Sequence, residues 1–250
     1  MISLPSSAIH EGTLILVNAA HPAVPAAPDD LCPLAAHPNI HLRREAANAL
    51  TQALDALAQE KAILPLSGYR TNAEQQRLYN DSLRNNGPVF TRQFVALPGT
   101  SEHETGLAID LALDQSPIDP ICPAFPYTGI CQHFRTLAPQ YGFIERYPAG
   151  KETITGIAHE PWHFRYVGSP HAQLITLQGF CLEDYLHWLR QYTRERPLRT
   201  RQHHHSDALI YFQPWEENNL TDIVTLPQPH TISGNNDDGF IVTIWNDGHD

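Results

Sequence analysis

The 250-residue sequence lacks several features that mark particular classes of protein. No window approaches eighteen apolar residues, so a membrane-spanning helix is not expected, and the segment after Met1 shows neither the basic stretch nor the long apolar run of an export signal. Basic residues are outnumbered, with 16 Lys plus Arg against 27 Asp plus Glu. The formal charge of -11 argues against nucleic acid and anionic membrane surfaces as partners. We therefore expect a cytoplasmic protein without a membrane span.

Cysteine is also scarce. The four cysteines, Cys32, Cys122, Cys131 and Cys181, show neither the tight spacing of a metal site nor the dense pattern of a disulfide framework. Ordinary reduced thiols are therefore expected. In an exported protein, Cys122 and Cys131 would be the first pair to consider for a disulfide.

Histidines and carboxylates are grouped in two short stretches. Ser101–Asp110 reads Ser-Glu-His-Glu-Thr-Gly-Leu-Ala-Ile-Asp, which places His103 seven residues before Asp110, and Glu160 later precedes His163 by three residues. Catalytic zinc is commonly held by three His or carboxylate ligands with the fourth position open to water. His103, Asp110 and His163 are the predicted ligands of one zinc ion. Glu160 then remains as a carboxylate that can accept a proton from that water, whose pKa zinc lowers to roughly 7.

Local patterning places these residues on strands. Branched apolar residues alternate with small residues over 106–113, so one face is expected to be buried while Asp110 lies among small neighbours on the other, which leaves room for an ion. In the later strand the same alternation predicts that Glu160 and His163 lie on opposite faces. Pro161 can bend that alternation, because proline cannot extend a regular ladder.

The combined pattern, Ser-x-His-x-x-Gly-x-Ala-x-Asp followed by Glu-Pro-Trp-His, resembles the zinc D,D-peptidases of the VanX, VanY and VanXY group, peptidase family M15. Upstream, residues 67–71 (Ser-Gly-Tyr-Arg-Thr) match the arginine-bearing segment of that family. Downstream, residues 141–144 and 162–168 look most like the VanXY branch. The resemblance covers about residues 12–195 and leaves the last fifty or so outside it.

The resemblance implies hydrolysis of D-Ala-D-Ala termini, on the free dipeptide, on muramyl pentapeptide precursors of peptidoglycan, or on both, with release of D-Ala. It also implies a link to vancomycin resistance. Two rival functions stay open from the sequence. One is another cell-wall peptidase of the same superfamily, an L,D-carboxypeptidase or an L-Ala-D-Glu endopeptidase. The other is a non-catalytic zinc-binding module.

The resemblance also assigns roles to individual residues. Glu160 is the implied proton-transfer residue, and Arg70 is implied to face the zinc and to stabilise the charge that develops on the scissile carbonyl oxygen. Gln75, Ser101 and Trp162 match positions that border the substrate. Taken without the resemblance, Arg70 is more typical of a surface ion pair than of a catalytic site. Ser101 is as typical of a turn cap, and Trp162 of a core residue, as each is of a substrate contact.

Glu102 and Glu104 flank the predicted ligand His103. Their sequence context does not distinguish them from solvated acids, and neither is predicted to be catalytic.

The predicted fold is α+β, with a central antiparallel sheet, flanking helices and one zinc site. Sheet strands are expected at 106–113, 143–147 and 162–167, and helices at 42–61 and 71–86. The second helix begins at a capping box, Thr71 with Glu74, and is expected to end at Gly87, before a loop over 88–100.

The predicted domains are a peptidase domain over 1–195 and a linker with a small β-rich extension over 196–250. A short buried strand is expected at 13–18. The three histidines at 203–205 are assigned to the exposed linker. Further strands are expected at 209–212, 223–226 and 240–245.

Overall fold

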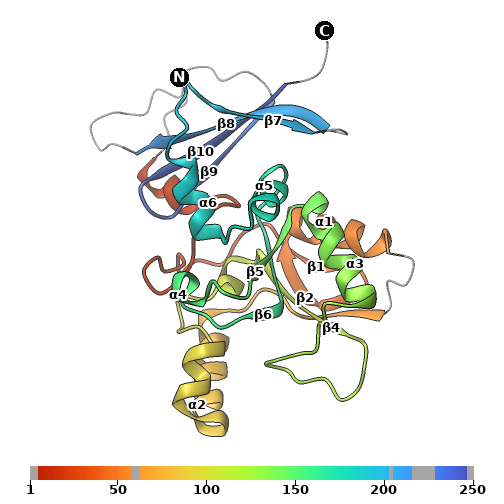
Figure 1. Cartoon of the computed structure of the whole chain (residues 1–250). Helices are drawn as coiled ribbons and strands as arrows, with labels where there is room; N and C mark the ends of the chain where they lie inside the picture. Colours follow the sequence, from red (N-terminus) through yellow and green to blue (C-terminus); the bar gives the residue numbers. More distant parts are fainter. Residues whose placement is uncertain (1–4, 58–61, 203–204, 216–228, 247–250) are drawn as a thin grey trace. The chain divides into compact units, whose positions relative to one another are not determined.

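The computed structural model describes residues 5–57, 62–202, 205–215 and 229–246. Two compact units are distinguished by their internal contacts, Val17–Cys181 and a second unit that joins Met1–Leu16 to Leu182–Asp250 (Figure 1). The division expected from the sequence, at residues 195 and 196, stays a prediction about independently folding domains. Within the described ranges, no helix is long and apolar enough to cross a membrane.

The larger unit is built on a four-stranded antiparallel sheet with the strand order β3-β4-β6-β5 (Figure 1). The strands are β3 Ile63–Ser67, β4 Ala108–Leu113, β5 Phe143–Tyr147 and β6 Glu160–Tyr166. The register pairs Asp110 with His163 across β4 and β6, and Ser67 with Asp110 across β3 and β4. Paired residues share a face of a sheet, so the fold itself brings together ligands that lie far apart in the sequence. This sheet with its flanking helices confirms the α+β class.

The two faces of β4 have different environments. Leu107, Ile109 and Leu111 are fully buried, as the alternation predicts. Ile109 is paired with Phe164 of β6, whose ring meets Phe134 at 5.0 Å between centroids. Phe134 belongs to helix α3, Gly129–Leu137, which therefore packs on this apolar face. The opposite face, which carries Asp110, is left for polar chemistry.

Helix α2, Asn72–Phe94, begins at the predicted capping box, in which Thr71 and Glu74 exchange hydrogen bonds. The prediction of a loop from residue 88 is wrong for 88–94. Gly87 does interrupt the helix with φ of 80°, but Pro88 follows it and a second helical segment continues to Phe94. Proline is well suited to the first turn of a helix, where its missing N–H costs nothing.

The larger unit also contains helix α1, two further strands and several short helices. Helix α1 buries Ala46, Leu50 and Ala53 and confirms the core of the helix expected at 42–61, of which residues 58–61 lie outside the described ranges. The bounds are β1 Leu31–Leu34, β2 His37–Arg43, α1 Arg44–Asp55, η3 Glu102–Thr105, η4 Ala138–Tyr141, α4 Glu152–Thr155 and α5 His171–Gln178.

The second unit contains a four-stranded antiparallel sheet with the order β7-β8-β10-β9 (Figure 1). Tyr211, Val242 and Ile244 form part of its core. Its elements are η1 Ser6–His10, α6 Leu182–Leu189, β7 Leu198–Gln202, β8 His205–Pro214, β9 His230–Gly234 and β10 Gly239–Asn246.

Two of the three strands expected in the tail, 209–212 and 240–245, are confirmed. The third, 223–226, lies outside the described residues, as do His203 and His204. The strand expected at 13–18 is wrong. Leu14 and Leu16 are buried there, but their N–H groups donate singly to Ser233 and Asn235 instead of joining a ladder.

Candidate active site

A cavity of about 220 Å³ opens on the polar face of the β3-β4-β6-β5 sheet. Residues of β3, α2, η3, β4, β5 and β6 line it, together with residues of the segments between these elements. All eight residues that the sequence predicts for the site line it. They are Arg70, Gln75, Ser101, His103, Asp110, Glu160, Trp162 and His163. A volume of this size suits a small ligand, below the range of drug-sized pockets.

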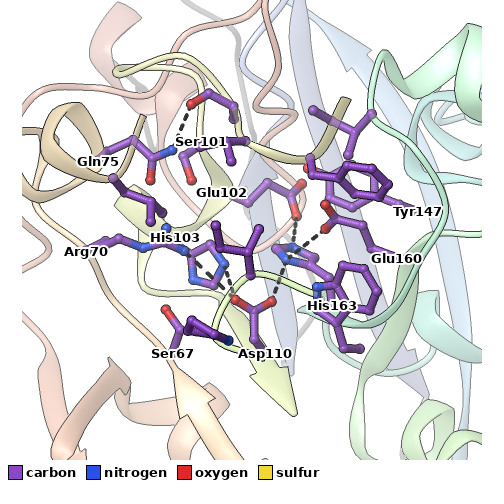
Figure 2. Close-up of a pocket in the computed structure, with 18 residues that line it drawn as sticks. Ser67, Arg70, Gln75, Ser101, Glu102, His103, Asp110, Tyr147, Glu160 and His163 are labelled. Carbon is purple, nitrogen blue, oxygen red and sulfur yellow. Dashed lines mark hydrogen bonds and ion pairs between the residues drawn. The ribbon is translucent and has the colours of Figure 1, made fainter. Parts of the chain in front are cut away.

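His103, Asp110 and His163 point their donor atoms toward one another (Figure 2). Nε2 of His103 lies 3.1 Å from Oδ2 of Asp110, and Nδ1 of His163 lies 3.0 Å from Oδ1. One donor atom from each residue falls within 4.8 Å of the others. Two imidazole nitrogens and one carboxylate form a ligand set found in catalytic zinc sites, so the residues present fit a zinc ion.

The outward nitrogen of each histidine also has a partner. Nδ1 of His103 lies 2.7 Å from the carbonyl oxygen of Gly68, and Nε2 of His163 lies 3.4 Å from Oε2 of Glu102. The inward nitrogens, Nε2 of His103 and Nδ1 of His163, are the ones that face Asp110. In ligating histidines the outer nitrogen commonly donates to an oxygen of this kind, and that contact fixes the orientation of the ring.

The charges of the cluster follow from these contacts. Burial opposes ionisation of Asp110, but the neighbouring imidazoles of His103 and His163 hold the pKa of that carboxyl well below its usual range. Burial also lowers the pKa of His103, and the Arg70 charge lowers it further. For His163, hydrogen bonds to Asp110 and Glu102 outweigh burial and raise its pKa to about 9.

Glu160 lies on the same side of β6 as His163, so the predicted placement on opposite faces is wrong (Figure 2). Its Oε2 is 3.8 Å from Nδ1 of His163. The β5-β6 register is irregular between Glu145 and Tyr147, opposite Pro161, which accounts for the shift. Only 5% of Glu160 is exposed, and burial raises its pKa to about 8, with Asp110 and Glu102 adding to the effect.

Arg70 occupies the junction between β3 and α2. Its backbone N–H donates to the carbonyl oxygen of His103 at 3.1 Å, and Nη2 lies 3.9 Å from Oδ2 of Asp110. Burial lowers the pKa of Arg70, and the carboxylates of Asp110 and Glu160 oppose that effect. Arg70 lines the cavity and its side chain is only 17% exposed, so the alternative of a surface ion pair does not hold.

Two buried polar atoms of the described chain lack a hydrogen-bond partner, Nε of Arg70 and Oε1 of Gln75. Gln75 is 1% exposed, and its Nε2 is already bound to the carbonyl oxygen of Ala96 at 2.7 Å. Buried polar groups normally find partners. Both residues line the cavity, and each has one side-chain polar atom that no other group of the described chain satisfies.

Ser101 and Trp162 line the cavity and are 4% and 7% exposed. The Ser101 side chain makes no capping hydrogen bond to η3, so the cap alternative does not hold. Trp162 stacks on Phe94 with 6.4 Å between ring centroids, and both rings border the cavity. It is thus at once a packed residue and part of the wall.

Sequence reasoning missed Glu102. Both Glu102 and Glu104 are buried, at 1% and 8% exposure, so the expectation of solvated acids is wrong. Oε1 of Glu102 accepts from Nε of Arg146 and from Nη1 of Arg165, each at 2.7 Å. The motif carries no signal of this burial, because those arginines lie 44 and 63 residues further along the chain.

Several known proteins are similar to this chain. Residues 39–169 match the family model VanY, D-alanyl-D-alanine carboxypeptidase. The chain is 46% identical to the bifunctional D-Ala-D-Ala dipeptidase and D-Ala-D-Ala carboxypeptidase VanXYC of Enterococcus gallinarum over 187 residues, which cover 73% of this chain and 98% of that protein.

Solved structures are also similar. The vancomycin resistance D,D-dipeptidase VanXYg, crystallised with a phosphinate analogue of D-Ala-D-Ala, shares 44% identity with a TM-score of 0.93 over 98% of both chains. That likeness takes in the C-terminal residues that the sequence resemblance leaves out. A variant of the D,D-pentapeptidase VanY from a VanB-type resistance cassette, in complex with Zn(II), shares 32% identity over 70% of this chain and 98% of that chain, with a TM-score of 0.58.

Proposed function

Because the chain belongs to the VanY D-alanyl-D-alanine carboxypeptidase family, we propose that it is a zinc-dependent D,D-peptidase that removes D-Ala from D-Ala-D-Ala termini. The observation that carries the proposal is the convergence, in one cavity, of a His-Asp-His set of potential ligands, the carboxylate of Glu160 and the partly buried guanidinium of Arg70. A purely structural zinc site needs neither Glu160 nor Arg70, and structural sites are usually closed by a fourth protein ligand.

In this proposal His103, Asp110 and His163 hold one zinc ion per chain. When bound, the ion lowers the pKa of a water ligand and polarises the scissile carbonyl. The relatives support this assignment, since the VanY variant was solved with Zn(II).

Glu160 is the proposed general base and acid. Oε2 of Glu160 lies 3.8 Å from Nδ1 of His163, but Glu160 is not one of the three converging residues. Its carboxylate can therefore accept a proton from the attacking water and return it to the departing amine. A raised pKa, about 8, suits a group that must both take and give a proton near neutrality. Positioned acid–base groups of this kind contribute on the order of 10²–10⁴ in rate.

Arg70 is proposed to donate to the carbonyl oxygen as negative charge develops on it. The Nε of Arg70 has no hydrogen-bond partner, and its Nη2 lies near Asp110 at the centre of the site, so the planar group has N–H donors for this role. Gln75 is proposed to accept an N–H of the substrate through its unused Oε1. Ser101 and Trp162 are proposed to border the bound peptide.

The proposed substrates are the free dipeptide and the muramyl pentapeptide precursor, as the bifunctional activity of VanXYC suggests. A cytoplasmic location and a role in vancomycin resistance belong to the same proposal and rest on the resemblance to the VanXY proteins.

The test is to incubate the zinc-loaded chain with D-Ala-D-Ala, with the muramyl pentapeptide, and with a tetrapeptide that ends in an L,D linkage, and to measure the released D-Ala. Release from either of the first two and not from the third supports the proposal. Release from the tetrapeptide alone would replace it with an L,D-carboxypeptidase.

A further inference from the structure

A buried ionic cluster lies beside the candidate metal site. Glu102 of η3, Arg146 of β5 and Arg165 of β6 each have side chains with 0% exposure. Oε1 of Glu102 accepts from both arginines at 2.7 Å. Burying such ions is costly, and replacement by apolar residues is often neutral or stabilising. Stability alone therefore does not account for these three buried charges, and a functional role is the better explanation.

The second oxygen of the same carboxylate points at a metal ligand. Oε2 of Glu102 lies 3.4 Å from Nε2 of His163, on the side of the ring opposite Nδ1 (Figure 2). Nδ1 faces Asp110 and Glu160. The two oxygens of Glu102 therefore have different partners. Oε1 accepts from two guanidinium groups, and Oε2 faces the His163 ring.

We propose that Glu102 is a positioning residue for the metal site: it keeps the proton of His163 on Nε2, so that Nδ1 is free to coordinate, while Arg146 and Arg165 fix the carboxylate in place. This inference rests on the proposed zinc site. Carboxylates that accept from the outer N–H of a ligating histidine set its tautomer and ring orientation, and their loss typically costs 10–100-fold in metal affinity or activity.

Glu102→Gln is a sharp test because the structure dictates which way the amide turns. The two arginines are donors only, so they retain the amide oxygen at the Oε1 position, and the NH₂ group takes the Oε2 position. That NH₂ would donate to Nε2 of His163 and move the ring proton to Nδ1, the nitrogen needed for the metal. The substitution therefore reverses the tautomer with almost no change of shape.

Glu104→Gln is the matched control. Glu104 is on the same short helix and is also buried, but its oxygens accept from Gly99 N at 2.7 Å and from Asn72 Nδ2 at 3.0 Å. Neither partner is a metal ligand. A loss caused only by removing a buried charge near η3 should affect both variants alike.

The experiment is a competition titration of Zn²⁺ between a chromophoric chelator and three full-length proteins, the wild type, Glu102→Gln and Glu104→Gln, with folding checked by circular dichroism. We expect zinc affinity to fall by roughly 10–100-fold in Glu102→Gln and to stay within about twofold of wild type in Glu104→Gln. Equal affinity of folded Glu102→Gln and wild type, or equal losses in both variants, overturns the inference and leaves the zinc site intact. A wild type that binds no zinc overturns the site and the inference together.

A second measurement uses the wild type alone and therefore tests the inference even if Glu102→Gln does not fold. Long-range ¹H–¹⁵N spectra of the zinc-loaded wild type report the tautomer of each histidine, and His163 is expected to be protonated at Nε2 and coordinated through Nδ1. The reverse assignment, with the proton on Nδ1, contradicts the inference.

Discussion

Replacing Arg70 with Ala is expected to lower kcat by about 10²–10³ while zinc stays bound. Arg70 is not one of the three converging ligands, so its removal leaves their donor atoms unchanged. What is lost is a partly buried, permanently charged donor group at the wall of the cavity.

The magnitude follows from the geometry. Nη2 of Arg70 lies 3.9 Å from Oδ2 of Asp110, which shows how closely the guanidinium approaches charge at the centre of the site. At an effective dielectric constant of about 20, unit charges at such a separation interact with roughly 4 kcal/mol. An oxyanion that carries most of a charge at a comparable distance would lose about 3–4 kcal/mol, which corresponds to the expected drop in kcat.

The assay is steady-state release of D-Ala from D-Ala-D-Ala by the zinc-loaded variant, with zinc content measured in parallel. Arg77→Ala is the control, because Arg77 is exposed on α2, the helix that follows Arg70, and its loss should change kcat by less than about twofold. Arg70→Lys should recover little of the loss, since a single ammonium cannot reproduce the planar donor group. A wild-type kcat in Arg70→Ala at full zinc occupancy would refute the role of Arg70.

Three further outcomes are expected. His163→Ala removes one of three converging ligands, so zinc measured after dialysis should fall to background, whereas retention at the wild-type ratio would contradict the ligand set. Thr71→Ala removes the cap of α2 and should cost about 1 kcal/mol, seen as a lower urea midpoint; an unchanged midpoint would deny the capping box a stabilising role. Burial lowers the pKa of His171 to about 3, so the folded chain keeps it neutral while the unfolded chain gains a proton below about 6.5. The free energy of unfolding should therefore drop by about 2 kcal/mol more in the wild type than in His171→Leu between pH 7 and pH 5, and parallel losses would contradict this.

The convergence of His103, Asp110 and His163 was predictable because their spacing is encoded locally. His103 and Asp110 sit in one motif, and the alternation over 106–113 correctly predicted a buried face behind Asp110. His163 belongs to a second short motif that pairs with the first in the sheet. Zinc chemistry limits which residue types serve as ligands, so pattern and chemistry together were sufficient.

The placement of Glu160 was not predictable from the same alternation. Pro161 follows Glu160, and the β5-β6 ladder is irregular opposite that point. Side chains three residues apart, Glu160 and His163, therefore lie on one face, where strict alternation places them on opposite faces. Gly87 likewise looked like the end of a helix, whereas the chain kinks there and Pro88 starts a second helical segment.

Burial of Glu102 depends on partners that are distant in sequence. Arg146 and Arg165 reach it only because β5 and β6 are neighbours in the sheet, and no local pattern reports that pairing. The unpaired Oε1 of Gln75 is equally a product of tertiary structure, since the amide is fixed by the carbonyl oxygen of Ala96. The motifs thus give the proposed ligands, whereas only the fold places Glu102 beside His163.

The most direct test of the account measures D-Ala release and zinc content side by side for the wild type and for Glu160→Ala. Glu160 is 3.8 Å from a ligand nitrogen but outside the group of converging donors. The variant should keep its zinc and lose about 10²–10⁴ in kcat on both the dipeptide and the pentapeptide. Full zinc occupancy combined with wild-type turnover would contradict the assignment of Glu160 and, with it, the proposed mechanism.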